Sequence, residues 1–427
     1  MRRSGYILAV ILAAAGPSLA ASVQTTKPEL TGFSTERLTR IHEMVQRHMD
    51  AHDISGAVTL VARNGKVAHF EAHGLADLEA KKPMSKDSLF WMMSMTKPVV
   101  GTAVLMMMEE GKLRLTDPVS RFIPEFKSMK VAVMEDRPAS VPAPDRGTPP
   151  LFYTIPTTRE LTIQDLLTHV NGLNSGGAAS SAEVAKIALK AGEKLSDYIP
   201  RLATTPLDFQ PGTRWQYSAL AAWDTLERVV EVITGKSFDR FARERIFDPL
   251  DMKDTGFVAS PEQLKRFAVL YRGTDATLTK VENKPVWLNN PTYFSGGGGL
   301  MSSAEDYLQF GQMLANRGEL NGKRLLGPKT VELMSSVFVP DTLPGRAKGR
   351  GFGLSVQVIT DHIAATTPIS NGSFGWDGAY GTHFWVDPKE KIVGLFMIQD
   401  SGPKLSMNLD FETAVMQALI EPAADHN

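Results

Sequence analysis

The sequence predicts an α+β fold in which a mainly antiparallel sheet with flanking helices is joined to a largely helical lobe. Three observations predict it: strand patterns occur near both ends of the chain, helical patterns dominate the middle, and a last helical pattern closes the chain. Strands from the two ends can pair in one sheet with the middle inserted between them. We therefore expect an α/β lobe from residues 22–115 together with 290–427, and a helical lobe from 116–289.

The N-terminal part of the α/β lobe is predicted as one helix followed by a β-hairpin. Apolar residues recur at helical spacing over 35–49. Strand patterns over 55–63 and 66–72 flank Asn64-Gly65, a dipeptide strongly associated with two-residue hairpin turns. The first three elements are therefore expected to be helix, strand, strand.

The remaining elements follow from the same periodicities. Helices are predicted over 94–110, 163–168, 182–189, 219–234, 238–246, 304–316, 330–337 and 409–420, and strands over 351–358, 381–386 and 391–399. The proline-rich stretch 126–156 is predicted to be an irregular insertion, because loops of that length in a compact domain are usually functional or disordered.

The N-terminus has the features of a secretory signal peptide over residues 1–20. Arg2 and Arg3 precede an apolar run, and small residues stand at the usual cleavage spacing before Ala21. The apolar run is too short for a comfortable membrane span, although an uncleaved interfacial segment is an alternative. We therefore expect an exported protein, either periplasmic or secreted, with no stable membrane partner after cleavage.

Composition excludes several classes of function. The formal net charge is −1, which offers no electrostatic basis for binding nucleic acid. The chain contains no cysteine, which excludes a cysteine nucleophile, zinc–cysteine sites and iron–sulfur clusters. His48 and His52 have a spacing that could bind a metal, but we interpret them as part of a solvated helix face. No metal and no cofactor are expected.

A Ser-x-x-Lys motif begins the helix predicted over 94–110. Residues three apart share a helix face, so the amine of Lys97 can lie beside the hydroxyl of Ser94. Serine needs a base to act as a nucleophile, and a lysine can serve if burial lowers its pKa. The motif alone is common by chance, because a serine that only caps a helix can be followed three residues later by an exposed lysine.

Two further motifs give that tetrapeptide a specific context. Residues 215–219 read Trp-Gln-Tyr-Ser-Ala and open a helix, and residues 376–379 read Trp-Asp-Gly-Ala before a strand. In this order the three motifs resemble those of serine β-lactamases and penicillin-binding proteins, and most of all those of the class C-like family VIII carboxylesterases. Supporting segments are 166–169, 172–173, 247–250, 252 and 295–300, so the resemblance covers roughly residues 35–420.

The resemblance implies a β-lactamase/transpeptidase-like fold and a set of catalytic roles. Ser94 would be acylated by the substrate, and Lys97 and Tyr217 would share the work of the general base. Which of these two side chains holds the proton at rest stays open at this stage. The backbone N–H groups of Ser94 and Ala379 would form the oxyanion hole, and Gly378 would allow the backbone to approach the substrate closely.

Departures from the family pattern concern the substrate. Ala219 replaces the asparagine that binds an amide side chain, Trp376 replaces the lysine that binds a carboxylate, and Asp377 adds a charge that disfavours anions. Met95 follows the nucleophile and is expected, with Gly378, to contact the substrate. We therefore predict a serine carboxylesterase that acts on neutral small-molecule esters, with at most weak β-lactamase activity.

Three alternatives remain open at this stage. A β-lactamase or D-stereospecific peptidase would use the same mechanism on another substrate. An acyltransferase would pass the acyl group to an acceptor other than water. A non-catalytic cell-wall-binding module is less expected, because it would normally have lost one of Ser94, Lys97 and Tyr217.

Overall fold

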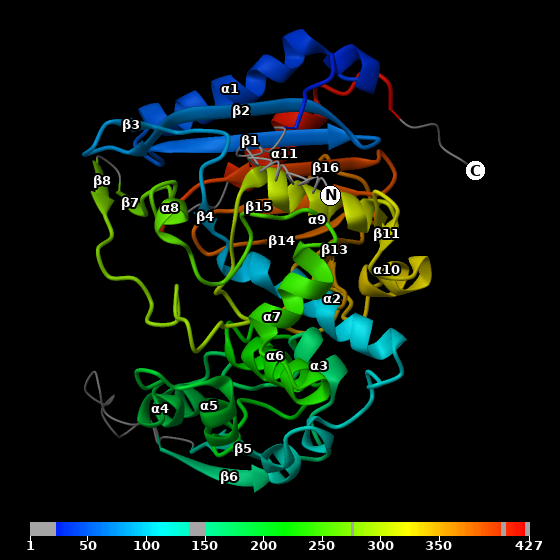
Figure 1. The fold of residues 1–427 in the computed structure, drawn as a ribbon. Coiled ribbons are helices and arrows are strands. Elements are labelled where there is room, and N and C mark those ends of the chain that lie inside the picture. Colours follow the sequence, from blue (N-terminus) through cyan, green and yellow to red (C-terminus); the bar gives the residue numbers. More distant parts are fainter. Residues whose placement is uncertain (1–22, 136–150, 275–276, 403–406, 423–427) are drawn as a thin grey trace, which may run out of the picture.

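An eight-stranded antiparallel sheet forms the upper half of the molecule in Figure 1, between helices on its two faces. The structure is a computed structural model that describes residues 23–135, 151–274, 277–402 and 407–422. The sheet has the order β12-β13-β14-β15-β16-β1-β2-β3. Its strands are β1 (Gly56–Arg63), β2 (Lys66–Asp77), β3 (Lys82–Pro83), β12 (Arg350–Phe352), β13 (Gln357–Ile359), β14 (Phe374–Asp377), β15 (His383–Asp387) and β16 (Ile392–Met397). The predicted α+β class with a mainly antiparallel sheet is confirmed.

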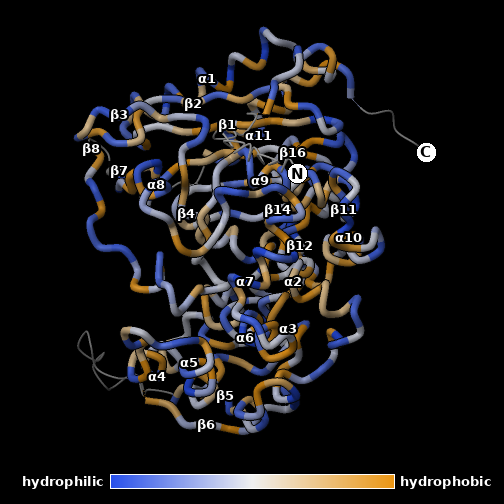
Figure 2. The backbone as a smooth tube through the Cα atoms, in the orientation of Figure 1, coloured by the Kyte–Doolittle hydropathy of each residue, from blue (hydrophilic) through white to orange (hydrophobic). Residues whose placement is uncertain are grey.

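Helices cover both faces of this sheet. On one face α1 (Thr35–Asp50) and α11 (Met407–Met416) pack together and bury an apolar layer against β1, β15 and β16. Hydrophobic and hydrophilic residues alternate along α1, as expected of a helix with one buried side (Figure 2). On the other face α9 (Ala304–Ala315) packs against β15 and β16, and α2 (Thr96–Glu109) belongs to the same larger core.

The middle of the chain is mainly helical; its helices α3 to α7 lie below the sheet in Figure 1, and α8 lies beside the sheet. Its helices are α3 (Ile163–Leu167), α4 (Ala178–Lys186), α5 (Leu195–Leu202), α6 (Ala221–Thr234), α7 (Phe238–Ala242), with the π-helical turn Arg243–Phe247, and α8 (Pro261–Leu264); α10 (Pro328–Met334) follows α9. Short 3-10 helices are η1 (Pro28–Thr31), η2 (Met93–Met95), η3 (Val119–Arg121) and η4 (Pro124–Ser128).

Four two-stranded pairs complete the fold. They are β4 (Phe90–Trp91) with β9 (Met301–Ser302), β5 (Lys130–Met134) with β6 (Phe152–Pro156), β7 (Tyr271–Thr274) with β8 (Thr277–Lys280), and β10 (Glu319–Leu320) with β11 (Lys323–Arg324). No helix among the described residues is both long enough and apolar enough to span a membrane.

The predicted opening of the chain is confirmed. Ser34 caps α1 by accepting a hydrogen bond from the backbone N–H of Arg37. Asn64 and Gly65 have φ values of 53° and 76°, the positive pair that a type I′ hairpin requires. The following strand is longer than predicted and continues to Asp77.

The prediction of an irregular segment over 126–156 was wrong at both of its ends. Residues 130–134 and 152–156 pair as β5 and β6, because they are rich in β-branched and aromatic residues. Residues 136–150, which hold most of the prolines, lie outside the described residues, as does the signal peptide predicted over 1–20.

Candidate active site

Ser94 lies in η2, directly before α2, in a segment fixed by the pairing of β4 with β9. The preceding residue, Met93, has a φ of 49°, which is rare for a residue with a side chain. Ser94 itself is only half-buried. The first N–H groups of a helix have no partner within that helix, so this position suits a group that must stabilise negative charge.

The hydroxyl oxygen of Ser94 accepts hydrogen bonds from the two side chains predicted to handle protons. Lys97 Nζ lies 2.9 Å from Ser94 Oγ, and Tyr217 Oη lies 2.6 Å from the same atom. Lys97 Nζ also donates to the carbonyl oxygen of Gly297 at 2.6 Å. The structure thus brings together three residues that are up to 123 positions apart in the chain.

Burial shifts the pKa values of the two proton-handling groups in opposite directions. Lys97 is fully buried, and desolvation lowers the pKa of its amine well below the usual 10.5, against the opposing charge of Asp224. Desolvation raises the pKa of Tyr217 to about 12, although its hydrogen bond to Ser94 opposes this shift. Both shifts favour the uncharged forms, a neutral amine and a protonated phenol.

Asp224, on α6, fixes the glycine-rich loop, residues 295–300, whose Gly297 carbonyl contacts Lys97. Its carboxylate accepts hydrogen bonds from Tyr293 Oη at 2.6 Å, from the backbone N–H of Gly297 at 3.0 Å and from Ser295 Oγ at 3.1 Å. The carbonyl of Gly297 is thereby held at Lys97 Nζ. Sequence reasoning missed Asp224; the available signal was an acidic residue on the apolar face of a predicted helix.

The end of β14 lies against the segment that precedes Ser94. The backbone N–H of Gly378 donates to the carbonyl of Thr382 at 2.7 Å, and Thr382 Oγ1 donates to the carbonyl of Met92 at 3.1 Å. A Cβ atom on Gly378 would lie only 2.4 Å from that Met92 oxygen, so this approach requires glycine. Ala379 is exposed in the next turn, and its N–H has no hydrogen-bond partner among the described residues.

Aromatic side chains surround the phenol of Tyr217 and make this side of the site apolar. The Trp376 ring centroid lies 5.7 Å from that of Tyr217 and 5.1 Å from that of Phe352. His169 packs against Tyr217 at 4.6 Å, and burial lowers the pKa of its imidazole well below 6.5. The imidazole accepts the backbone N–H of Ser218 at Nδ1, a structural role.

Comparison with known proteins identifies the family. The model of the Beta-lactamase family matches residues 41–416. The chain belongs to this family. It is 33% identical over 411 residues to Esterase EstB of Burkholderia gladioli, covering 86% of this chain and 92% of that protein. Protein Rv1367c of Mycobacterium tuberculosis is 37% identical over 371 residues, which cover 84% of this chain and 89% of the relative.

A solved structure places this β-lactamase-family chain near the esterases. The structure of EstCE1, a hydrolase with promiscuous acyltransferase activity, superposes with a TM-score of 0.74 and 28% identity. The alignment covers 89% of this chain and 99% of EstCE1. The chain therefore has the β-lactamase/transpeptidase-like fold and lies close to the family VIII esterases within the serine β-lactamase-like superfamily.

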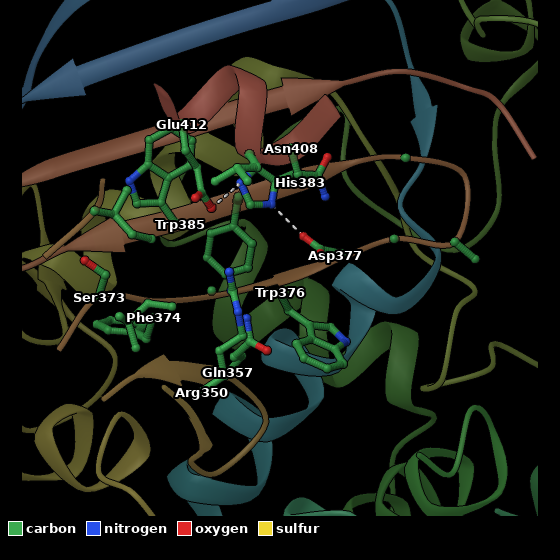
Figure 3. A pocket seen from close by; sticks show the side chains of 18 of the residues that line it. Arg350, Gln357, Ser373, Phe374, Trp376, Asp377, His383, Trp385, Asn408 and Glu412 are labelled. Carbon is green, nitrogen blue, oxygen red and sulfur yellow. Dashed lines mark hydrogen bonds and ion pairs between the residues drawn. The ribbon is translucent and has the colours of Figure 1, made fainter. Parts of the chain in front are cut away.

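The position of Asp377 in this β-lactamase-family chain corrects the expectation that its charge faces the substrate. Successive residues of a strand point to opposite faces, and Asp377 is directed away from Trp376 toward His383, whose Nδ1 lies 2.5 Å from its carboxylate (Figure 3). His383 also pairs with Glu412 of α11 at 3.4 Å. The negative charge is therefore paired on the α11 side of the sheet and does not face Ser94.

His383 and its two carboxylate partners, Asp377 and Glu412, line a cavity of about 470 Å³, shown in Figure 3. Glu412 and Asn408 of α11 line it together with Arg350 and Gln357 at the other end of the sheet. Ser94, Lys97 and Tyr217 do not line this cavity, but Trp376, Gly378 and Ala379 do, so the cavity borders the strand end that faces Ser94.

Two further expectations about individual residues are settled by burial and pairing. Met95 is fully buried in the main core, which corrects the expectation that it contacts the substrate. Ala219 is exposed beside the glycine-rich loop. His48 contacts the carboxylates of Asp53 and Asp410 and its side chain is only 13% exposed, which corrects the expectation of a solvated face, whereas His52 is exposed.

Proposed function

We propose that the chain is a serine hydrolase that cleaves carboxylic esters through an acyl-enzyme on Ser94. The observation that carries this proposal is the contact of one half-buried serine hydroxyl with the buried amine of Lys97 at 2.9 Å and with the phenol of Tyr217 at 2.6 Å. An activated nucleophile needs a base within hydrogen-bond reach, and this geometry supplies one.

In the acylation step, Lys97 acts as the general base. A neutral amine keeps one lone pair, so Nζ can donate to the carbonyl of Gly297 while it accepts the proton of Ser94. Ser94 Oγ then bonds to the ester carbonyl carbon, and backbone N–H groups of Ser94 and Ala379 stabilise the oxyanion. The carbon–oxygen bond to the alcohol breaks, and the phenol of Tyr217 protonates the departing oxygen and regains its proton from Lys97.

In the deacylation step, water replaces the alcohol. Lys97, neutral again, takes a proton from the water, whose oxygen attacks the acyl carbon. The bond between this carbon and Ser94 Oγ breaks, and the proton returns to Oγ. The products are a carboxylic acid and the starting enzyme.

We propose neutral, apolar esters as the substrate class. Trp376 presents an uncharged aromatic surface next to Tyr217, and Ala219 offers no side-chain amide for recognising a peptide or β-lactam. The likeness to Esterase EstB supports this choice over a β-lactamase. Acyl transfer is the second candidate, because EstCE1 carries a promiscuous acyltransferase activity.

We also propose that the protein acts outside the cytoplasm. The basic start, apolar run and small residues of positions 1–20 support this location. Because such export signals are removed by cleavage, mass spectrometry of the protein recovered from periplasm would reveal a mature N-terminus near Ala21.

The substrate proposal is tested by comparing an ester with a lactam. Purified wild type, Ser94→Ala and the control Ser336→Ala, an exposed serine on the surface, are assayed with p-nitrophenyl butyrate and a chromogenic cephalosporin. We expect rapid ester cleavage by wild type and Ser336→Ala, loss of activity in Ser94→Ala, and little lactam opening. A kcat/KM higher for the cephalosporin than for the ester would contradict the esterase proposal.

A further inference from the structure

A cluster of metal-ligating side chains lies between α1 and β2. It consists of His42 from the helix and Glu71 and His73 from the strand, and their ligand atoms all lie within 4.8 Å of one another. His42 Nδ1 is 2.8 Å from Glu71 Oε1, and His73 Nδ1 is 3.6 Å from the same oxygen. The cluster is on the sheet face covered by α1, whereas α2 behind Ser94 belongs to the core of the opposite face.

Alternation along β2 puts the strand residues of the cluster on one face. Glu71 and His73 are two positions apart, so both point toward α1. The antiparallel register pairs Glu71 with Thr59 of β1, and the Thr59 side chain lies on the same face. β2 therefore supplies Glu71 and His73, β1 supplies the neighbouring Thr59, and α1, which covers this face of the sheet, supplies His42.

His73 is the residue that points most directly to a ligand. It is only 3% exposed, and its Nδ1 has no hydrogen-bond partner among the described residues. A distance of 3.6 Å to Glu71 is too long for a hydrogen bond. A buried polar nitrogen without a partner is costly, so its presence calls for an explanation.

The opposite ring nitrogen of His73 is fixed by Thr59. His73 Nε2 lies 2.9 Å from Thr59 Oγ1, and His69 Nε2 lies 2.7 Å from the same hydroxyl. The hydroxyl has one proton, so it can donate to His69 and accept Nε2–H from His73. In this tautomer, which metal binding requires, the lone pair of His73 lies at Nδ1 and is aimed into the cluster. An outer hydrogen bond of this kind commonly orients histidines that bind metals.

We propose that His42, Glu71 and His73 form a binding site for a divalent transition-metal ion of the Zn²⁺ class. Two imidazole nitrogens and one carboxylate oxygen are a ligand set that Zn²⁺ accepts, and water can fill the fourth position on the exposed side. His42 and Glu71 have side chains 54% and 40% exposed, so the ion can enter from solvent. Burial lowers the pKa of His73 to about 4, which keeps its imidazole neutral and able to ligate.

The role of this ion would be structural. It would join α1 to β2 and replace the hydrogen bond that now links His42 to Glu71. The site is independent of the proposed ester hydrolysis, because none of its residues contacts Ser94, Lys97 or Tyr217 in the described structure.

The test measures Zn²⁺ binding directly. The full chain is purified without a polyhistidine tag, treated with EDTA and dialysed, and then titrated with Zn²⁺ by calorimetry, with bound metal counted by elemental analysis. His42→Ala and Glu71→Gln remove the two solvent-accessible ligands. His52→Ala and Glu43→Gln are matched controls, because they change the same residue types at exposed positions within α1 or just after it. Thermal unfolding with and without Zn²⁺ is followed for each protein by circular dichroism.

We expect one Zn²⁺ per wild-type chain, a higher Tm with the ion, and binding weakened by at least about tenfold in both ligand variants. The two controls should bind as wild type does. Equal affinity in wild type and in the two ligand variants would overturn the proposal, and so would a wild type that binds no Zn²⁺. Neither readout depends on ester hydrolysis, so this result and that of the ester assay are separable.

Discussion

At the residue scale, the chemistry depends on two groups that share one hydrogen-bond acceptor. Ser94 Oγ contacts both Lys97 and Tyr217, and burial lowers the pKa of the amine while it raises that of the phenol to about 12. Near neutral pH Lys97 is therefore the group that is free to accept a proton, and Tyr217 is the group that still holds one. Asp224 modulates this balance, because its negative charge raises the pKa of Lys97 against the effect of burial.

The pH dependence of ester hydrolysis follows from this assignment. Activity needs neutral Lys97, so kcat/KM should rise with pH through the lowered pKa of its amine, at a midpoint below 10.5. Asp224→Asn keeps an oxygen that can accept the N–H of Gly297 but removes the charge, so the rising limb should move to lower pH. The profile of kcat/KM against pH measures this shift. A rising limb that stays in place or moves to higher pH would refute the role given to Asp224.

Trp376 sets the apolar character of the site, and a substitution there should change substrate preference. Trp376→Lys introduces a cation where the related β-lactamases carry one, and it removes the aromatic contact with Tyr217. We expect the ratio of cephalosporin to ester kcat/KM to rise by about tenfold or more. Parallel assays of the two substrates give the ratio, and a ratio equal to that of wild type would mean that Trp376 does not govern selectivity.

At the element scale, the site depends on the contact between the end of β14 and η2. β14 packs against η2, and only glycine at position 378 permits the observed distance from Met92. The glycine-rich loop near Gly297 is a second such element, held to α6 by Asp224. Both contacts join segments distant in sequence, so the catalytic geometry is a property of the packed elements.

A methyl group at position 378 should therefore impair both activity and stability. Gly378→Ala forces β14 away from Met92, and overpacking of this kind costs about 1–3 kcal/mol of unfolding free energy. Displacement of the Ala379 N–H should lower kcat by roughly 10²-fold. Denaturant unfolding and steady-state kinetics measure the two effects. Gly327→Ala is the control, since Gly327 has a φ of −69° and an added Cβ there first meets the end of the flexible Glu109 side chain, at 3.1 Å. Equal kcat in Gly378→Ala and wild type would contradict the assignment.

Helices and strands with strong local sequence signals could be predicted, and those without such signals could not. Asn64-Gly65 and the periodicity of 35–49 are local signals, and the structure confirms the hairpin and the helix. β14 was not predicted because it is only four residues long and contains a glycine. α5 was missed because Pro200 lies inside it, where a helix is disfavoured.

At the scale of the whole molecule, the sheet unites the two ends of the chain and α11 closes it. β1 pairs with β16, and His383 of β15 contacts both Asp377 and Glu412. Burial alone would lower the pKa of His383, but the two carboxylates raise it to about 9. The imidazole is thus charged over the neutral range and links β14, β15 and α11.

This link predicts a pH-dependent stability. A raised pKa in the folded state means that the contribution of His383 is complete below 6.5 and is lost as the pH rises through about 9. Asp377→Asn removes one partner, so its Tm should lie below that of wild type at neutral pH, with a difference that shrinks above pH 9. Thermal unfolding across this range measures it. A difference that is constant with pH would rule out an imidazolium at position 383.

The candidate site was predicted in part, and the limits are physical. Ser94, Lys97 and Tyr217 stand in short motifs whose spacing is visible in the chain, and the structure places them together. The direction of Asp377 depends on strand register, which no local pattern reveals. Residues 69–73 carry a signal that was overlooked, because their alternation of histidine and glutamate puts potential ligands on one strand face.

Covalent labelling of the nucleophile tests the central claim most directly. A p-nitrophenyl alkylphosphonate forms a stable adduct with an activated serine, and peptide mapping by mass spectrometry locates it. The proposed mechanism predicts one phosphonyl group per chain, on Ser94, with ester hydrolysis lost in proportion to labelling. Labelling at another residue, or full labelling of Ser94 with hydrolysis retained, would contradict the proposal that Ser94 is the nucleophile.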